Sequence, residues 1–191
     1  MNIEASIRGV PLSFETAPSL FSPTRVDAGT SLLLACVPFV PGDKVLDLGC
    51  GYGAIGIFAA KSLGPSHVYM IDSDPEAVTY AQRNARNNEV AGVHIELSDG
   101  FRDFRETAFT KILCNPPYHC DFSVAKHLIE KSFNRLLVGG TLWMVTKRDT
   151  WYRNKLTSLF GGVRVTARNT YFVFEARKKS RTYASRVPTS R

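Results

Sequence analysis

The chain has 191 residues, of which 44% are hydrophobic; this suffices for one globular domain with a substantial core and is too high for a disordered chain. The first residues include an acid and no apolar run, and the longest apolar stretch, 32–40, contains a proline, so we expect no signal peptide and no membrane partner. The 4 cysteines form no C-x-x-C pair, which favours reduced thiols in a cytoplasmic protein.

The first 40 residues are predicted to form an extension ahead of the main fold. Two apolar runs, 3–7 and 12–16, flank the segment Arg8–Pro11 and predict a small hairpin. A helix from about Asp27 to Ala35 then leads into the first strand.

From Lys44 onward, apolar runs alternate with helical patterns. Strands are predicted at 44–48, 67–71, 93–97, 111–114, 141–146, 163–168 and 171–176. Helices are predicted to end near Lys61 and to cover 74–88, 121–137 and 152–160, with Gly139-Gly140 ending the third. This alternation predicts an α/β fold with a mostly parallel sheet covered on both faces. The last two strands are joined by Asn169-Thr170 alone and must therefore pair antiparallel.

The charge of +7 is concentrated behind the last strand. Residues 1–176 are read as one domain that is close to neutral, and 177–191 as a basic tail without acids. Its basic residues are Arg177, Lys178, Lys179, Arg181, Arg186 and Arg191. Such a tail can contact the phosphates of a nucleic acid, or it can serve only solubility.

The first strand of the main fold ends in a glycine turn that carries an acid. Glycines at positions 49, 51 and 53 let the backbone pass close to a ligand, and Asp47 is an acid inside an apolar strand. Gly51, Gly53 and Gly56 also satisfy G-x-G-x-x-G, and Asp72 follows at a distance suited to a ribose hydroxyl, so a nicotinamide-linked oxidoreductase is one interpretation.

Asp47 favours a different ligand for this turn. A pyrophosphate needs an unopposed positive helix terminus, whereas a carboxylate beside the turn suits a cationic or amine-bearing ligand. S-adenosylmethionine has an amino group, a sulfonium and a ribose diol, and no phosphate. We therefore expect S-adenosylmethionine as the cofactor, with Asp72 at its ribose and Asp99 a candidate for its adenine amino group.

The fourth strand ends in Asn115-Pro116-Pro117-Tyr118, which predicts an amine-binding site. The two prolines hold the chain rigid and leave carbonyls free to accept hydrogen bonds. The Asn115 side-chain oxygen and the Pro116 carbonyl can hold the two hydrogens of a conjugated amine, while Tyr118 can stack on its ring. Nearby Cys114, His119 and Cys120 have no second ligand cluster, so no metal is expected.

These segments resemble class I methyltransferases, and the small-methyltransferase family among them. Residues 45–53 look like the first motif of class I enzymes, Asn115–Tyr118 like their amino-methylating motif, and 21–33 like the family's N-terminal signature. The resemblance implies a Rossmann-like, seven-stranded sheet with a reversed last strand. It also implies a cofactor cleft lined by Asp47, Gly49, Gly51, Asp72, Asp99 and Asn115, with Thr30 nearby.

The family includes ribosomal RNA guanine-N2 methyltransferases, so the resemblance favours guanine N2 of rRNA as the target. Those members commonly have Phe after the two prolines, where this chain has Tyr118, a residue also found in adenine-N6 and protein glutamine-N5 methyltransferases. Both remain alternatives, as does a non-catalytic module that has kept the cleft. Neither the methylated atom nor the oligomeric state follows from the sequence.

Overall fold

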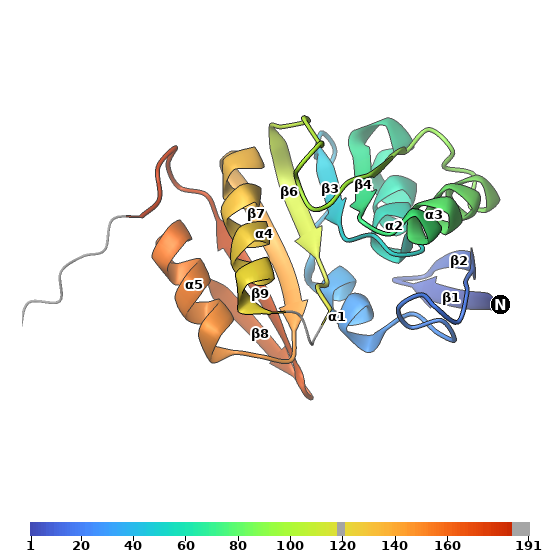
Figure 1. Cartoon of the computed structure of the whole chain (residues 1–191), viewed down its shortest axis with the longest axis horizontal. Helices are drawn as coiled ribbons and strands as arrows, with labels where there is room; N and C mark the ends of the chain where they lie inside the picture. The colour runs from blue at the N-terminus through green and yellow to red at the C-terminus, as the bar shows by residue number, and fades with distance from the viewer. Residues whose placement is uncertain (118–120, 185–191) are drawn as a thin grey trace, which may run out of the picture.

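The computed structural model describes residues 1–117 and 121–184. Its main sheet has 7 strands in the order β5-β4-β3-β6-β7-β9-β8 (Figure 1). The strands are β3 (Val45–Leu48), β4 (Val68–Asp72), β5 (His94–Leu97), β6 (Phe109–Cys114), β7 (Leu136–Thr146), β8 (Arg164–Arg168) and β9 (Tyr171–Arg177). Pairs from β5 through β7 are parallel, and β9 is antiparallel to both of its neighbours, which confirms the predicted sheet.

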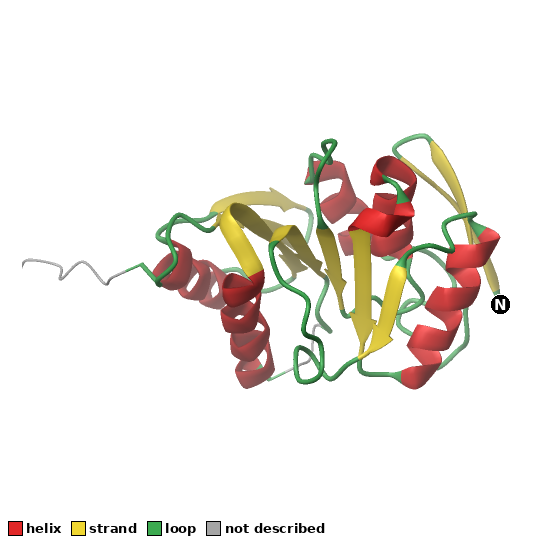
Figure 2. Ribbon diagram, turned by 90° about the horizontal axis from the view of Figure 1, so that it is seen from above, coloured by secondary structure: helices red, strands yellow, loops and turns green. Residues whose placement is uncertain are grey.

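Helices cover both faces of this sheet (Figure 2). The helices α1 (Ala28–Cys36), α2 (Ala54–Leu63) and α3 (Pro75–Asn87) pack on one face, and α4 (Phe122–Arg135) and α5 (Thr150–Phe160) on the other. Successive strand residues point to opposite faces of the sheet. Val45 therefore packs in the core under α1, α2 and α3, and Leu46 in the core under α4 and α5. A short 3₁₀ turn, η1 (Pro65–His67), precedes β4.

The loop 98–108 connects β5 to β6 and packs on the same face of the sheet as α4 and α5. Phe101 and Phe104 are buried there. The guanidinium of Arg135 donates to the carbonyl oxygens of Glu106 and Phe104 at 2.9 and 2.7 Å and lies over the Phe101 ring. The end of α4 therefore fixes this loop, which forms part of the site described below.

The predicted N-terminal hairpin is present as β1 (Asn2–Ile7) and β2 (Val10–Glu15). Its two-residue turn has positive φ at both positions, as a tight hairpin turn requires. Asn84 of α3 and Asn88, the residue that follows this helix, each accept a hydrogen bond from a backbone N–H of β2 and donate one to a carbonyl of the same strand. Two asparagine side chains thus take the place of a neighbouring strand and attach the hairpin to α3.

The boundary between α4 and β7 differs from the prediction. The helix ends at Arg135, and β7 begins at once with Leu136 and contains both glycines that were expected to end the helix. A Cβ on Gly140 would lie 2.9 Å from the Phe109 carbonyl oxygen, so this glycine permits close strand packing. Glycine inside a strand can mark such a close approach of two backbones.

The segment read as a basic tail begins inside the fold. Arg177 is the last residue of β9, and Lys178 is only 7% exposed. The Lys178 ammonium donates to the carbonyl oxygens of Phe133 and Leu136 at 2.7 and 2.8 Å, and burial lowers its pKa. Lys178 therefore caps the C-terminus of α4 and is not available to a phosphate, which corrects the predicted start of the tail.

Within residues 1–117 and 121–184, no helix is long and apolar enough to span a membrane.

Candidate functional site

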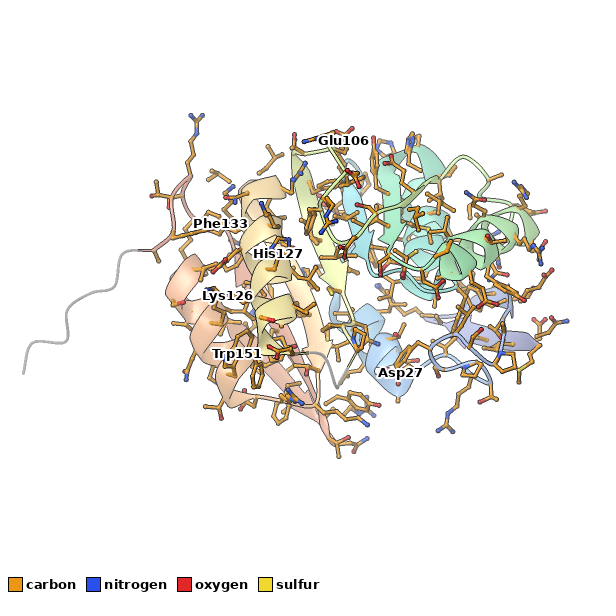
Figure 3. All side chains as sticks on the ribbon, viewed as in Figure 1. Asp27, Glu106, Lys126, His127, Phe133 and Trp151 are labelled. Carbon is orange, nitrogen blue, oxygen red and sulfur yellow. The ribbon has the colours of Figure 1, made fainter. Side chains whose placement is uncertain are left out.

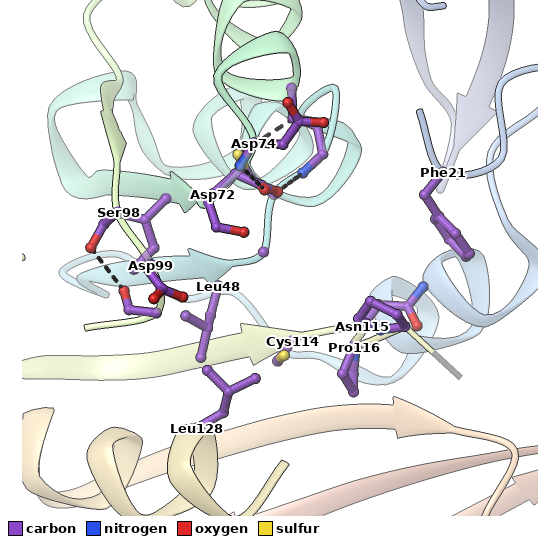
Figure 4. A pocket seen from close by; sticks show the side chains of 18 of the residues that line it. Phe21, Leu48, Asp72, Asp74, Ser98, Asp99, Cys114, Asn115, Pro116 and Leu128 are labelled. Atoms are coloured by element: carbon purple, nitrogen blue, oxygen red, sulfur yellow. Dashed lines mark hydrogen bonds between the residues drawn. The ribbon is translucent and has the colours of Figure 1, made fainter. Parts of the chain in front are cut away.

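A cavity of ≈ 880 Å³ opens at the carboxyl ends of β3, β4 and β6 (Figure 4). This is the edge where ligands collect in open parallel sheets, and the volume lies within the range of cofactor pockets. Figure 4 shows Ser98 and Asp99 on one side of it, Asn115 and Pro116 on the other, and Asp72 and Asp74 above. The glycine turn and the segment Asn115–Pro117 therefore face one cavity.

The glycine turn presents bare backbone to this cavity. Gly49 and Gly51 line it with φ of 75° and 55°, and a Cβ built on either would meet nothing within 4 Å. The carboxylate of Asp72 accepts from Gly51 N at 2.8 Å and from Asp74 N at 3.0 Å. Asp72 thus holds the turn in place while itself lining the cavity.

Asp47 lies behind the turn and is not among the residues that line the cavity in the described part of the chain. It is 0% exposed; its Oδ2 accepts from Gly56 N at 2.8 Å, and its Oδ1 is buried without a partner among the described residues. Burial raises the pKa of Asp47 to about 7. The hydrogen bond from Gly56 lowers this pKa, and the nearby charge of Asp72 raises it further. The expected direct contact with a cofactor is therefore corrected to a supporting role at the N-terminus of α2.

Two further glycines serve packing behind the turn. Gly53 precedes α2 with φ of 103° and, like Asp47, lies outside the cavity lining among the described residues. A Cβ on Gly56 would lie 2.5 Å from Met70 Cγ, so α2 needs glycine there to approach β4. The third glycine of the apparent dinucleotide pattern is thus explained by helix–strand packing.

Asp99 lines the cavity at its far end, and its contact with an adenine amino group stays a prediction. Its carboxylate is 71% exposed and lies 3.5 Å from Arg102. Five basic residues to which the sequence assigned no site role also line the cavity: Arg102, Arg105, His127, Lys131 and Arg135. They come from the loop 98–108 and from α4, so only the fold brings them together.

Asn115 is held by two residues far away in the sequence. Its Nδ2 donates to Thr30 Oγ1 at 2.9 Å and to Asp27 Oδ2 at 3.2 Å, which fixes the direction of the amide. The opposite atom, Oδ1, is buried and has no hydrogen-bond partner among the described residues. An unsatisfied buried acceptor is costly, so this oxygen is suited to a donor that a ligand brings.

Asp27 is the residue whose place in the site the sequence did not reveal. It caps α1 by accepting from Gly29 N and Thr30 N, and only this capping role was predictable. In the fold, its Oδ1 also accepts from Tyr171 OH at 3.3 Å, while Oδ2 accepts from Asn115. One carboxylate thus connects α1, the end of β6 and the start of β9.

The remaining predicted residues at this end are only partly described. Pro116 and Pro117 line the cavity, whereas Tyr118, His119 and Cys120 lie outside the described residues. Cys114 is buried at the end of β6 and also lines the cavity. Phe21, 47% exposed on the segment before α1, lies across from Asn115 and adds an aromatic ring that the sequence analysis gave no separate role (Figure 4).

A solved structure shares this architecture closely. It is the 16S rRNA N2 G1207 methyltransferase (RsmC) of T. thermophilus in complex with AdoMet and guanosine, with a TM-score of 0.87 and 28% identity. The match covers 94% of this chain and 50% of that one.

Curated relatives extend the comparison. Ribosomal RNA large subunit methyltransferase G of Aeromonas hydrophila is 32% identical over 174 residues, which cover 87% of this chain and 46% of that protein. Ribosomal RNA small subunit methyltransferase C of Haemophilus ducreyi is 34% identical over 181 residues, with 90% and 54% covered. The chain thus spans about half the length of these rRNA methyltransferases. By contrast, uncharacterized protein YbxB of Bacillus subtilis, 33% identical over 179 residues, is covered over 89% of its length.

Residues 11–175 match the family described as methyltransferase small domain, a range that holds the glycine turn, Asp72, Asn115 and most of the sheet. The chain therefore belongs to the methyltransferase small domain family.

Proposed function

We propose that this protein is an S-adenosylmethionine-dependent methyltransferase that methylates an amino nitrogen conjugated to a ring, with guanine N2 of rRNA as the target. The observation that carries the proposal is the oriented Asn115 amide. Its Oδ1 has no hydrogen-bond partner among the described residues, and Asn115 lines one cavity with the glycine turn and Asp72. The names of the rRNA methyltransferases that the chain resembles support the RNA substrate.

The residues around the turn fit the cofactor. Gly49 and Gly51 give a ligand access to the backbone, Asp72 offers a carboxylate to a ribose diol, and Asp99 stands at the end suited to an adenine amino group. When bound, the cofactor supplies a methyl group on a sulfonium. We call this half of the cavity the donor side, and the half around Asn115 the acceptor side.

On the acceptor side, the protein positions the amine. The Asn115 Oδ1 and the Pro116 carbonyl accept its two hydrogens, which directs the nitrogen lone pair toward the donor side. Phe21 supplies a ring face for the base, and Tyr118 remains a predicted stacking partner. A conjugated amine needs this positioning more than it needs a strong base.

The test combines donor binding with label transfer. The protein should bind S-adenosylmethionine in calorimetry and transfer labelled methyl groups to rRNA rather than to DNA or total protein, with N2-methylguanosine found after digestion. Asn115→Ala should lower transfer by roughly 10²- to 10³-fold and leave donor affinity within a few-fold. Asn134→Ala, an exposed asparagine on α4, is the matched control and should behave as wild type.

Other products would redirect the proposal. N6-methyladenosine or a methylated glutamine amide would move the target to the corresponding alternative. NAD bound in place of the methyl donor would overturn the proposal, and unchanged transfer by Asn115→Ala would remove the role assigned to that residue.

A further inference from the structure

The surface beside the acceptor side carries a layered stack of a cation and two aromatic rings. The Arg148 guanidinium lies over the Phe122 ring at 4.9 Å, and Phe122 stacks on Trp151 with ring centroids 4.5 Å apart and an interplanar angle of 24°. Arg148 is exposed, and so is Phe122, although a large apolar side chain is usually buried. We call these three residues the Arg148 stack.

The stack is fixed to the core from below. Trp151 packs edge-on against Tyr152 at 5.1 Å, and Tyr152, which is 3% exposed, stacks on the buried Phe174 of β9. A guanidinium that contacts a ring face can still donate hydrogen bonds from its N–H groups. Contact with the Phe122 ring restricts Arg148 and lowers the entropy that it loses when it binds a ligand.

The charges around the stack favour an anionic ligand. None of the ion pairs among residues 1–117 and 121–184 includes Arg148, and the neighbouring Asp149 pairs with Arg153 at 3.0 Å. Asp121, at the start of α4, uses its carboxylate to accept from Ser123 N. Lys147 adds a second exposed cation on the same side.

The stack is connected to the residues that orient Asn115. The Lys147 ammonium lies 5.2 Å from the centre of the Tyr171 ring, and Tyr171 OH donates to the Asp27 carboxylate that also holds Asn115. Trp151 and Asp27 both lie toward the edge at which β6 and β7 end (Figure 3). A polymer whose target base reaches Asn115 can therefore extend from the site onto this surface.

We propose that the Arg148 stack is the docking surface for the single-stranded RNA segment that flanks the target base, with Arg148 and Lys147 on its phosphates. This rests on the proposed function. Arginine with its planar N–H fork is suited to phosphate, and exposed aromatic rings beside cations are typical of surfaces that bind single strands.

The experiment measures binding of a fluorescein-labelled, unstructured 20-nucleotide RNA by anisotropy, with donor binding measured on the same preparations. Arg148→Ala should weaken RNA binding roughly 10-fold and lower the slope of log affinity against log salt by about one. Arg148→Lys should keep the slope and lose part of the affinity, because lysine keeps the charge and lacks the guanidinium's planar set of N–H donors. Arg86→Ala, an exposed arginine on α3, is the charge-matched control and should stay within twofold of wild type.

Trp151 provides a second, local readout. The chain has 2 tryptophans, and Trp143 is 5% exposed, so RNA should change the emission of Trp151 alone. Trp151→Phe keeps an aromatic layer under Phe122 and should remove this signal while retaining most of the affinity.

Two results would overturn the docking surface: Arg148→Ala binds RNA as tightly as wild type, or the wild-type protein binds the methyl donor but no RNA. Either result would leave the proposed donor side unaffected. Polyglutamate that binds as tightly as RNA and responds equally to Arg148→Ala would assign the surface to an acidic protein partner instead. Failure of donor binding would count against the proposed function, and an Arg148 effect on RNA would still be measurable.

Discussion

On the donor side, the polar contacts that shape the cavity join residues close together in the chain, whereas on the acceptor side they join distant segments. Asp47 and Gly56 are separated by 9 positions, and Asp72 and Gly51 by 21. Asn115, by contrast, lies 88 positions from Asp27, and Tyr171 lies 144 positions from it. The glycine turn and Asp72 on the donor side are therefore the product of one strand–turn–helix–strand unit. The acceptor side, like the loop around Asp99 that α4 holds, forms only when distant parts of the domain pack together.

This difference separates binding from transfer. A change on the acceptor side should leave the glycine turn intact, because the backbone N–H groups of Gly49 and Gly51 bond to Ile71 and Asp72 of β4 and not to α1 or β9. A change in the turn should weaken donor binding without moving Asn115.

Asp27→Ala should lower kcat by on the order of 100-fold, because Asn115 loses the carboxylate that fixes its amide and misplacement of a positioning group has effects of this size. KM for the methyl donor should stay within a few-fold of wild type. The control is Asp27→Ser, because serine also caps a helix but cannot bridge Asn115 and Tyr171. We expect Asp27→Ser to be as thermally stable as wild type but to have the low kcat of Asp27→Ala. Wild-type stability and wild-type kcat together would mean that Asp27 acts only as a helix cap.

Asp72→Ala should weaken binding of the methyl donor roughly 10- to 100-fold, since it removes charged hydrogen bonds that hold the glycine turn and a carboxylate that faces the ligand. Calorimetry with S-adenosylmethionine gives the affinity directly. Asp103→Ala, which removes an exposed acid from the loop 98–108, is the control. Equal losses in both variants would point to net charge rather than to the turn.

Asn84→Ala should lower the free energy of unfolding by about 1–3 kcal/mol, because its side chain replaces backbone pairing for β2 and also donates to the Tyr52 carbonyl beneath the glycine turn. Urea unfolding measures the change. The neighbouring Asn87→Ala removes only an exposed contact to Glu15 and should cost little. A similar loss in the two variants would contradict a specific attachment of the hairpin.

Asp47→Asn should change the pH dependence of stability. The pKa of Asp47 rises from 3.8 to about 7 on folding, so the folded state holds this proton more tightly. The stability contributed by this group is present below about pH 3.8 and is lost as the pH rises toward 7, with a slope of at most about 1.4 kcal/mol per pH unit. The variant should flatten this part of the profile between pH 4 and 7 in urea titrations, and an unchanged slope would show that Asp47 does not titrate there.

The sequence alone determined the order of strands and helices, the parallel sheet with its reversed strand, and the two motifs that face the cavity. These are local properties: periodicity sets the elements, Gly49 and Gly51 meet a positive-φ requirement of their own turn, and the carboxyl ends of parallel strands must share one edge. Because β3 and β6 are adjacent in the sheet, the glycine turn and Asn115 are brought together by topology.

Only the tertiary structure decided how individual polar groups are used. Asp47 faces inward and supports α2 rather than a ligand, Lys178 caps α4 rather than a phosphate, and Gly140 lies within β7 rather than ending a helix. In each case the deciding partner lies on another element, as it does for Asp27 beside Asn115. Residue type and spacing show that a charge or a glycine needs a particular environment, but which segment supplies that environment depends on which distant parts of the chain pack together.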